Sequence, residues 1–105
     1  MDEKTPLTEG VYYILLALYE PRHGYGIMQY VSELSKGRVE LGPGTVYGAI
    51  KSLVKRKWIQ PLEEEGRKKE YVITEEGKQV VEAEIRRLAE LYHNGLFITK
   101  GGQSE

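Results

Sequence analysis

One segment near the middle of the chain decides the fold. Residues 42–55 have the sequence Gly42-Pro43-Gly44-Thr45-Val46-Tyr47-Gly48-Ala49-Ile50-Lys51-Ser52-Leu53-Val54-Lys55. Proline suits the first position of a helix, because the N–H that it lacks would have no partner there. Helical spacing then puts the apolar residues on one face, namely Val46, Ile50, Leu53 and Val54. The other face consists of polar residues and glycines, namely Gly44, Thr45, Gly48, Lys51, Ser52 and Lys55. Tyr47 lies at the boundary between the two faces.

Two shorter helices are predicted before this segment. Thr8 is placed to cap the first, which Pro21 stops, and its apolar positions are Val11, Ile14, Leu15 and Leu18. The second has an apolar stripe at Ile27, Tyr30, Val31 and Leu34 and should end at Gly37 in a left-handed cap. Residues Val39 to Leu41 are expected to form a short strand.

A β-hairpin is predicted after the central helix. Strand character runs from Trp58-Ile59 to Leu62, turns over Glu65-Gly66-Arg67, and returns as Glu70 to Thr74. Pro61 cannot donate to a strand ladder, so its strand should lie at an edge or place the proline on the solvent side.

A long helix is expected to follow, capped by Thr74 and ending near Asn94-Gly95. Val81, Ile85, Leu88 and Tyr92 repeat with coiled-coil spacing, and Leu91, Leu96 and Phe97 add apolar surface. A helix of about 20 residues is about 30 Å long, more than a small three-helix core can cover. The spacing therefore favours dimerisation, while packing against the first helix of the same chain is the alternative.

Composition narrows the class of protein. The chain has 105 residues, enough for one core, and its longest apolar run is too short for a membrane span. The absence of cysteine excludes disulfides and thiolate metal sites and agrees with a cytoplasmic protein. Two distant histidines, His23 and His93, and no serine beside a base argue against an enzyme, a metal site or any cofactor.

The order of elements and the placement of basic residues indicate DNA binding. Three helices followed by a hairpin is the order of a winged helix-turn-helix, in which the third helix enters the major groove. The net charge is only −1, so local clusters must attract DNA. Lys51 and Lys55 lie on the outward face of the third helix, and Arg67, Lys68 and Lys69 lie at the hairpin tip. Clustered lysines that merely solvate a surface are the alternative.

Three motifs with this spacing resemble the PadR family of transcriptional regulators. They are His23-Gly24-Tyr25-Gly26-Ile27, Gly44 to Leu53, and Gly66-Arg67-Lys68-Lys69-Glu70-Tyr71-Val72-Ile73-Thr74-Glu75-Glu76-Gly77. The resemblance covers about residues 7–95. It implies a dimeric winged-helix repressor whose C-terminal helix packs on the partner's N-terminal helix, and whose repression is relieved by a small aromatic or phenolic ligand. Thr45, Tyr47 and Lys51 match the recognition-helix motif, and Arg67 and Lys68 match the wing.

These observations predict a mainly α fold with a small β-hairpin: a winged-helix DNA-binding domain at 7–74 and a dimerisation helix at 75–97 within the same compact unit. The expected partners are a second copy of the chain, a palindromic duplex operator and a small aromatic effector. The expected DNA contacts are Thr45, Tyr47, Gly48, Lys51, Ser52, Lys55, Arg67, Lys68 and Lys69. The expected dimer interface consists of Val11, Leu15, Val81, Ile85, Leu88, Leu91 and Tyr92, and Tyr12 and Tyr92 are the candidate ligand contacts. A winged helix that binds only other proteins is the competing hypothesis.

Overall fold

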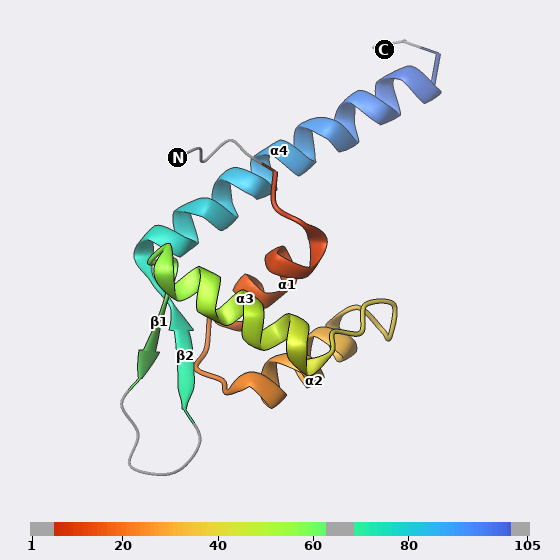
Figure 1. Cartoon of the computed structure of the whole chain (residues 1–105). Coiled ribbons are helices and arrows are strands. Elements are labelled where there is room, and N and C mark those ends of the chain that lie inside the picture. The colour runs from red at the N-terminus through yellow and green to blue at the C-terminus, as the bar shows by residue number, and fades with distance from the viewer. Residues whose placement is uncertain (1–5, 63–68, 102–105) are drawn as a thin grey trace.

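The chain folds as four helices and one hairpin in the order α1, α2, α3, β1, β2, α4 (Figure 1). The computed structural model describes residues 6–62 and 69–101. The helices are α1 (Glu9–Ala17), α2 (Gly24–Leu34), α3 (Pro43–Lys55) and α4 (Glu75–Thr99), and the strands are β1 (Ile59–Leu62) and β2 (Glu70–Ile73). This confirms the predicted mainly helical fold with a two-stranded wing.

The short helices begin where the sequence supplies side-chain caps. The hydroxyl of Thr8 accepts a hydrogen bond from the Val11 N–H at 3.2 Å and starts α1. The imidazole Nδ1 of His23 accepts from the Gly26 N–H at 3.3 Å and starts α2. Pro43 stands in the first turn of α3, as predicted, and Gly37 adopts a left-handed φ of 80° after α2. The Thr8 and His23 side chains each satisfy a backbone donor that would otherwise have no partner in its helix.

The core collects apolar side chains from every helix and both strands. Its members are Ile14, Leu15, Ala17, Leu18, Ile27, Val31, Val46, Ile50, Leu53, Ile59, Ile73, Val80 and Val81. Val46, Ile50 and Leu53 are buried as the helical spacing predicted, while Val54 is half-buried. The body is thus held together by one continuous apolar cluster, which fixes α3 against α1 and α2.

The hairpin accommodates a proline because of its hydrogen-bond pattern. Pro61 pairs with Tyr71 in the antiparallel register. The N–H of Tyr71 donates to the Arg22 carbonyl at 2.9 Å, and its carbonyl accepts from the Arg22 N–H at 3.1 Å. In an antiparallel ladder both groups of one residue point to the same side, so Tyr71 needs no donor from Pro61. As predicted for the proline, β1 lies at the edge, and β2 lies between β1 and the segment that precedes α2.

The start of α4 is fixed tightly against the base of the hairpin. The Thr74 hydroxyl accepts from the Gly77 N–H at 3.0 Å and donates to the Lys57 carbonyl at 2.8 Å. A Cβ added at Gly77 would lie 2.2 Å from the Trp58 carbonyl oxygen, which leaves no room for any larger residue. Glycine at this position therefore allows α4 to approach β1.

Two predicted features differ from the structure. Residues 39–41 form no strand, because the Val39 N–H donates to the Ser35 hydroxyl at 3.0 Å rather than to a strand partner. The last helix continues through Asn94 and Gly95 to Thr99. Glycine inside a helix costs only about 1 kcal/mol relative to alanine, and the residues that follow Gly95 are apolar and compatible with a helix.

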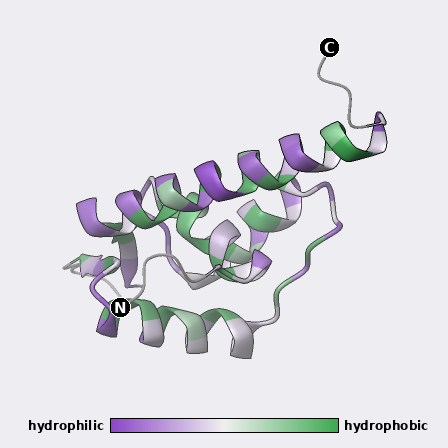
Figure 2. Ribbon diagram, turned by 90° about the horizontal axis from the view of Figure 1, so that it is seen from above, coloured by the Kyte–Doolittle hydropathy of each residue, from purple (hydrophilic) through white to green (hydrophobic). Residues whose placement is uncertain are grey.

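The far part of α4 extends beyond the body of the molecule (Figure 1). Every residue from 91 to 100 is exposed. Figure 2 shows hydrophobic residues near the end of this helix, after a more hydrophilic stretch. The sequence there includes Leu96, Phe97 and Ile98, which are all exposed in the single chain. This part of α4 therefore has an apolar surface that the described part of the chain leaves uncovered.

Candidate nucleic-acid interface

Helix α3 presents the face that the sequence predicted. Its buried positions hold it against the core, and the residues of the opposite face are exposed: Thr45, Gly48, Lys51, Ser52 and Lys55. The helix begins without a side-chain hydrogen bond, because Gly42 has no side chain to cap it. A Cβ placed at Gly44 or Gly48 would meet nothing within 4 Å. Packing within the chain thus does not require these glycines. Because they have no side chains, nothing projects from the exposed face of α3 at these two positions.

Tyr47 lies against the start of α2, at one end of this face. A Cβ at Gly24 would lie 2.4 Å from the Tyr47 hydroxyl oxygen and ring, so a larger residue at position 24 would displace the tyrosine ring from this place. Gly24 is buried, whereas Tyr47 remains 52% exposed. The contact joins the first residue of α2 to the exposed face of α3. Helical spacing placed Tyr47 at a boundary but did not reveal its contact with Gly24.

The charge near α3 differs from that of the whole chain. Residues 41–62 contain Lys51, Lys55, Arg56 and Lys57 and no acidic residue, although the chain has a net charge of −1. All four cationic residues are exposed. The Arg56 guanidinium lies 5.0 Å from the centre of the Trp58 ring, so stacking orients this group at the end of α3. The segment therefore offers a positive surface to an anionic partner.

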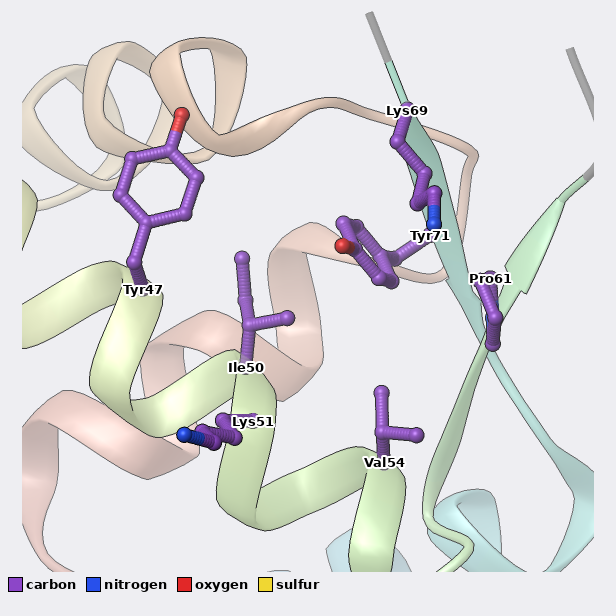
Figure 3. Close-up of a pocket in the computed structure, with 7 residues that line it drawn as sticks. All are labelled: Tyr47, Ile50, Lys51, Val54, Pro61, Lys69 and Tyr71. Atoms are coloured by element: carbon purple, nitrogen blue, oxygen red, sulfur yellow. The ribbon is translucent and has the colours of Figure 1, made fainter.

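The hairpin places Lys69 beside this surface. A shallow groove of about 300 Å³ separates α3 from the strands, and Figure 3 shows the side chains that line it. They are Tyr47, Ile50, Lys51 and Val54 from α3, Pro61 from β1, Lys69 just before β2, and Tyr71 from β2. The predicted contacts Arg67 and Lys68 lie outside the described residues. The structure thus brings Lys69 together with Tyr47 and Lys51 around one groove.

A second hollow lies between α1 and α4, and it contains one of the two candidate ligand residues. It measures about 360 Å³ and is lined by Leu7, Glu9, Tyr12, Tyr13, Glu84, Arg87 and Leu88. Tyr92 is absent from this lining and is 64% exposed further along α4. The single chain therefore does not bring Tyr12 and Tyr92 into one pocket.

An ion pair closes one side of this hollow. Arg87 donates through Nε to Glu84 Oε1 at 3.0 Å and through Nη2 to Glu84 Oε2 at 2.6 Å, and the Leu7 N–H donates to Oε2 at 3.3 Å. The hydrogen bonds from Arg87 lower the pKa of the Glu84 carboxyl, even though burial acts in the opposite direction. Burial, together with the nearby Glu84 charge, raises the pKa of Tyr12. The sequence did not distinguish this pair, since an i, i+3 spacing of opposite charges is common on solvated helix faces.

The predicted dimer residues fall into two groups. Leu15 and Val81 are fully buried in the core of the single chain, so we reassign them from the interface to the core. Their helical spacing cannot separate a core position from an interface position, because both are apolar. Val11 is half-buried, and the remaining positions are exposed on α4: Ile85, Leu88, Leu91 and Tyr92.

Two further features limit the chemistry of the molecule. Across residues 6–62 and 69–101, no three histidine, cysteine or carboxylate side chains gather as metal ligands would. Over the same ranges, no helix has the length and hydropathy needed to cross a bilayer.

A third helix with a free polar face, packed on two others and followed by a hairpin, defines the winged-helix class of DNA-binding domains.

Comparison with known proteins identifies the family within this class. Residues 13–83 match the model of the transcriptional regulator PadR-like family, and the chain belongs to that family. This family is one of transcriptional regulators, which agrees with the winged helix described above and with the family resemblance of the sequence.

Curated relatives support this assignment over part of their length. A 37.1 kDa protein of transposon TN4556 from Streptomyces fradiae is 38% identical over 79 residues, which are 74% of this chain and 22% of that protein. Transcriptional regulator YqjI of Escherichia coli is 35% identical over 60 residues, 57% of this chain and 29% of the relative. The chain thus spans less than a third of the length of either protein.

Solved structures share the fold. RosR of H. salinarum superposes with a TM-score of 0.68 at 27% identity, covering 80% of this chain and 76% of that one. A complex structure of the same protein, hsRosR-S4, gives a TM-score of 0.71 at 26% identity and covers 84% and 76%. A PadR family regulator from Eggerthella lenta gives a TM-score of 0.67 at 21% identity, covering 89% and 82%.

Proposed function

We propose that this protein is a homodimeric repressor that binds a palindromic duplex operator in a sequence-specific manner. The single observation on which this rests is the exposed face of α3, where Thr45, Ser52, Lys51 and Lys55 surround the bare Gly48 beside the hairpin. Hydroxyl and ammonium groups can bind base edges and phosphates, and glycine permits close approach. We assign DNA binding to residues 7–74, in the cytoplasm, where such a regulator would meet its operator.

The proposed dimer rests on the continuity of one face of α4. In its first half this face packs on the body through Val80, Val81 and Glu84, all buried. Helical spacing carries the same face onward through Leu88, Leu91 and Tyr92, which are exposed. Leaving apolar surface exposed to water costs about 25 cal/mol of free energy per Å². A second copy, packed through this helix and the half-buried Val11 of α1, would cover it.

The proposed effector is a small aromatic or phenolic compound held near Tyr12. The hollow between α1 and α4 is lined by aromatic and aliphatic side chains together with Glu9, Glu84 and Arg87, and it reaches the exposed stripe at Leu88. Tyr92 would complete this pocket only if contributed by the second copy, because it lies outside the lining within one chain. Binding there would act on the packing of α4, and thereby on the spacing of the two α3 helices.

The proposal is tested by selecting a duplex with the wild-type protein from a random pool and measuring its affinity by fluorescence anisotropy. Replacing Lys51 and Lys55 together by alanine should weaken binding at least tenfold and lower the salt slope by about 0.9 for each phosphate that is no longer neutralised. The dimer should remain intact in sedimentation. The control is Lys100→Ala, an exposed lysine at the end of α4, which should bind as wild type.

Two results would contradict the proposal. Failure of the wild-type protein to select any duplex would favour a protein-binding winged helix instead. Unchanged affinity of the double lysine variant would remove α3 from the recognition role.

A further inference from the structure

The groove between α3 and the hairpin follows from the alternation of side chains along the strands. Ile59 and Ile73, paired at the base of the hairpin, are buried. Two residues further out, Pro61 pairs with Tyr71 on the same face, with Tyr71 half-buried. Lys69 continues this alternation just before β2 and is exposed. The inner face of the hairpin therefore changes from core, to an apolar wall, to a cation as it leaves the body.

The opposite wall comes from α3. Figure 3 shows Ile50 and Val54 extending from α3 toward the hairpin, with Tyr71 extending from β2 toward them. Tyr47 stands at one end of the groove, and Lys51 lies at its α3 edge (Figure 3). The space of about 300 Å³ thus has an apolar floor, with a lysine on the α3 side and another on the hairpin side.

The chemistry of this lining restricts the occupant. Its charged residues, Lys51 and Lys69, are both cationic, so an anion is favoured. A phosphate alone would gain nothing from Val54, Pro61 and the Tyr71 ring. A deoxyribose ring bonded to phosphates on both sides offers C–H surface for the floor and negative charge for the lysines. The combination therefore matches one sugar–phosphate strand better than an isolated ion.

We propose that this groove holds the backbone of one DNA strand, with a deoxyribose packed against Val54, Pro61 and Tyr71 and the flanking phosphates bound by Lys51 and Lys69. The inference rests on the proposed DNA-binding function and extends it to Val54, Pro61 and Tyr71, which are not among the DNA contacts expected from the sequence. In this arrangement the exposed face of α3 contacts the bases, and the groove fixes how deeply α3 enters. The contacts to the strand supply affinity and position without sequence preference.

The test compares two substitutions at one position. Val54→Phe fills the groove, and Val54→Ala leaves it open, while neither introduces a polar group into the half-buried site. With the duplex selected by the wild-type protein, Val54→Phe should lose at least tenfold in affinity and Val54→Ala should stay within about threefold. Circular dichroism and sedimentation establish that both variants remain folded and keep the oligomeric state of the wild type.

A second variant keeps the test independent of folding. Lys69→Ala changes an exposed side chain and should lower the salt slope by about 0.9, the value for one phosphate contact. Lys100→Ala is its matched control. If Val54→Phe and Lys69→Ala bind like the wild type while the Lys51 and Lys55 double variant does not, α3 binds DNA and the groove proposal is overturned. If the wild-type protein itself selects no duplex, the proposed function has failed.

Discussion

Helices α3 and α4 each leave one face uncovered, and the two faces differ in chemistry. The face of α3 is glycine, hydroxyl and lysine, and packing does not require its two glycines. The face of α4 is leucine, isoleucine and tyrosine, and it continues the surface by which that helix packs on the body. An uncovered polar face is stable in water and attracts a charged partner, whereas an uncovered apolar face is stabilised by a second apolar surface.

This difference explains why one small domain can be expected to bind two kinds of partner without interference. The α3 face lies beside the hairpin, whereas the exposed part of α4 extends away from the body (Figure 1). A change on the α3 face should therefore leave the dimer intact, and variants of the two faces can test this separation.

The largest effect is expected from Leu88→Glu on the apolar face of α4. A carboxylate buried in an apolar interface has no partner there, so the dimer dissociation constant should rise at least 100-fold. Analytical ultracentrifugation over a concentration series measures the change. The control is Glu90→Gln, which alters an exposed carboxylate on the same stretch of α4. A dimer as tight as that of the wild type would show that the interface lies elsewhere.

A smaller effect is expected from Gly48→Ala on α3, and it should have opposite signs in two measurements. The added methyl meets nothing within 4 Å, so the variant should gain about 0.5–1 kcal/mol in unfolding free energy. The same methyl should hinder approach to DNA and lower affinity about tenfold. Gly95→Ala in α4 is the matched control, since its Cβ also has open space. It should be stabilised equally, with unchanged DNA affinity at concentrations where the protein is fully dimeric.

The ion pair beside α1 predicts a dependence of stability on pH. Because Arg87 lowers the pKa of Glu84 in the folded chain, this carboxylate stabilises the fold above its unfolded pKa of about 4.3. That contribution should be lost as pH falls through the lower folded pKa. Thermal melts should show Glu84→Gln less stable than wild type at pH 7, with the difference shrinking toward pH 3. A constant difference over this range would contradict the assignment.

The smallest effect concerns the first turn of α2. His23→Ala removes the acceptor of the Gly26 N–H and should cost about 1 kcal/mol in unfolding free energy, measured by urea denaturation. His23→Asn should recover most of this loss, because asparagine also caps helices well. Equal losses in both variants would show that His23 acts through packing rather than through the cap.

The sequence was sufficient to predict the elements that depend on local patterns. Helical spacing identified the buried residues of α3, the cap at Thr74 located the start of α4, and Pro61 indicated an edge strand. The strand expected at 39–41 was wrong because β propensity does not reveal whether a partner strand exists. The end expected at Gly95 was wrong because one glycine does not stop a helix with compatible residues beyond it.

The features that the sequence did not reveal all depend on contacts that spacing cannot show. Gly24 at the start of α2 contacts the Tyr47 side chain of α3, and Gly77 contacts the Trp58 carbonyl. Nothing in the spacing of the sequence indicates that either glycine is needed for such a contact. Spacing likewise could not show that Tyr71 and Val54 line a groove, or that Leu15 and Val81 belong to the core. Periodicity identifies the side of an element that is apolar, but not what covers it.

The length of α4 gives the molecule a mechanical property. At 25 residues, this helix acts as a rigid lever arm whose base is clamped at Gly77 and whose tip is exposed in the single chain. For a rod of about 37 Å, a tilt of about 5° at the base displaces the tip by about 3 Å. If two such helices are joined along their exposed parts, a slight tilt at the base would change the separation of the two α3 helices by several ångströms.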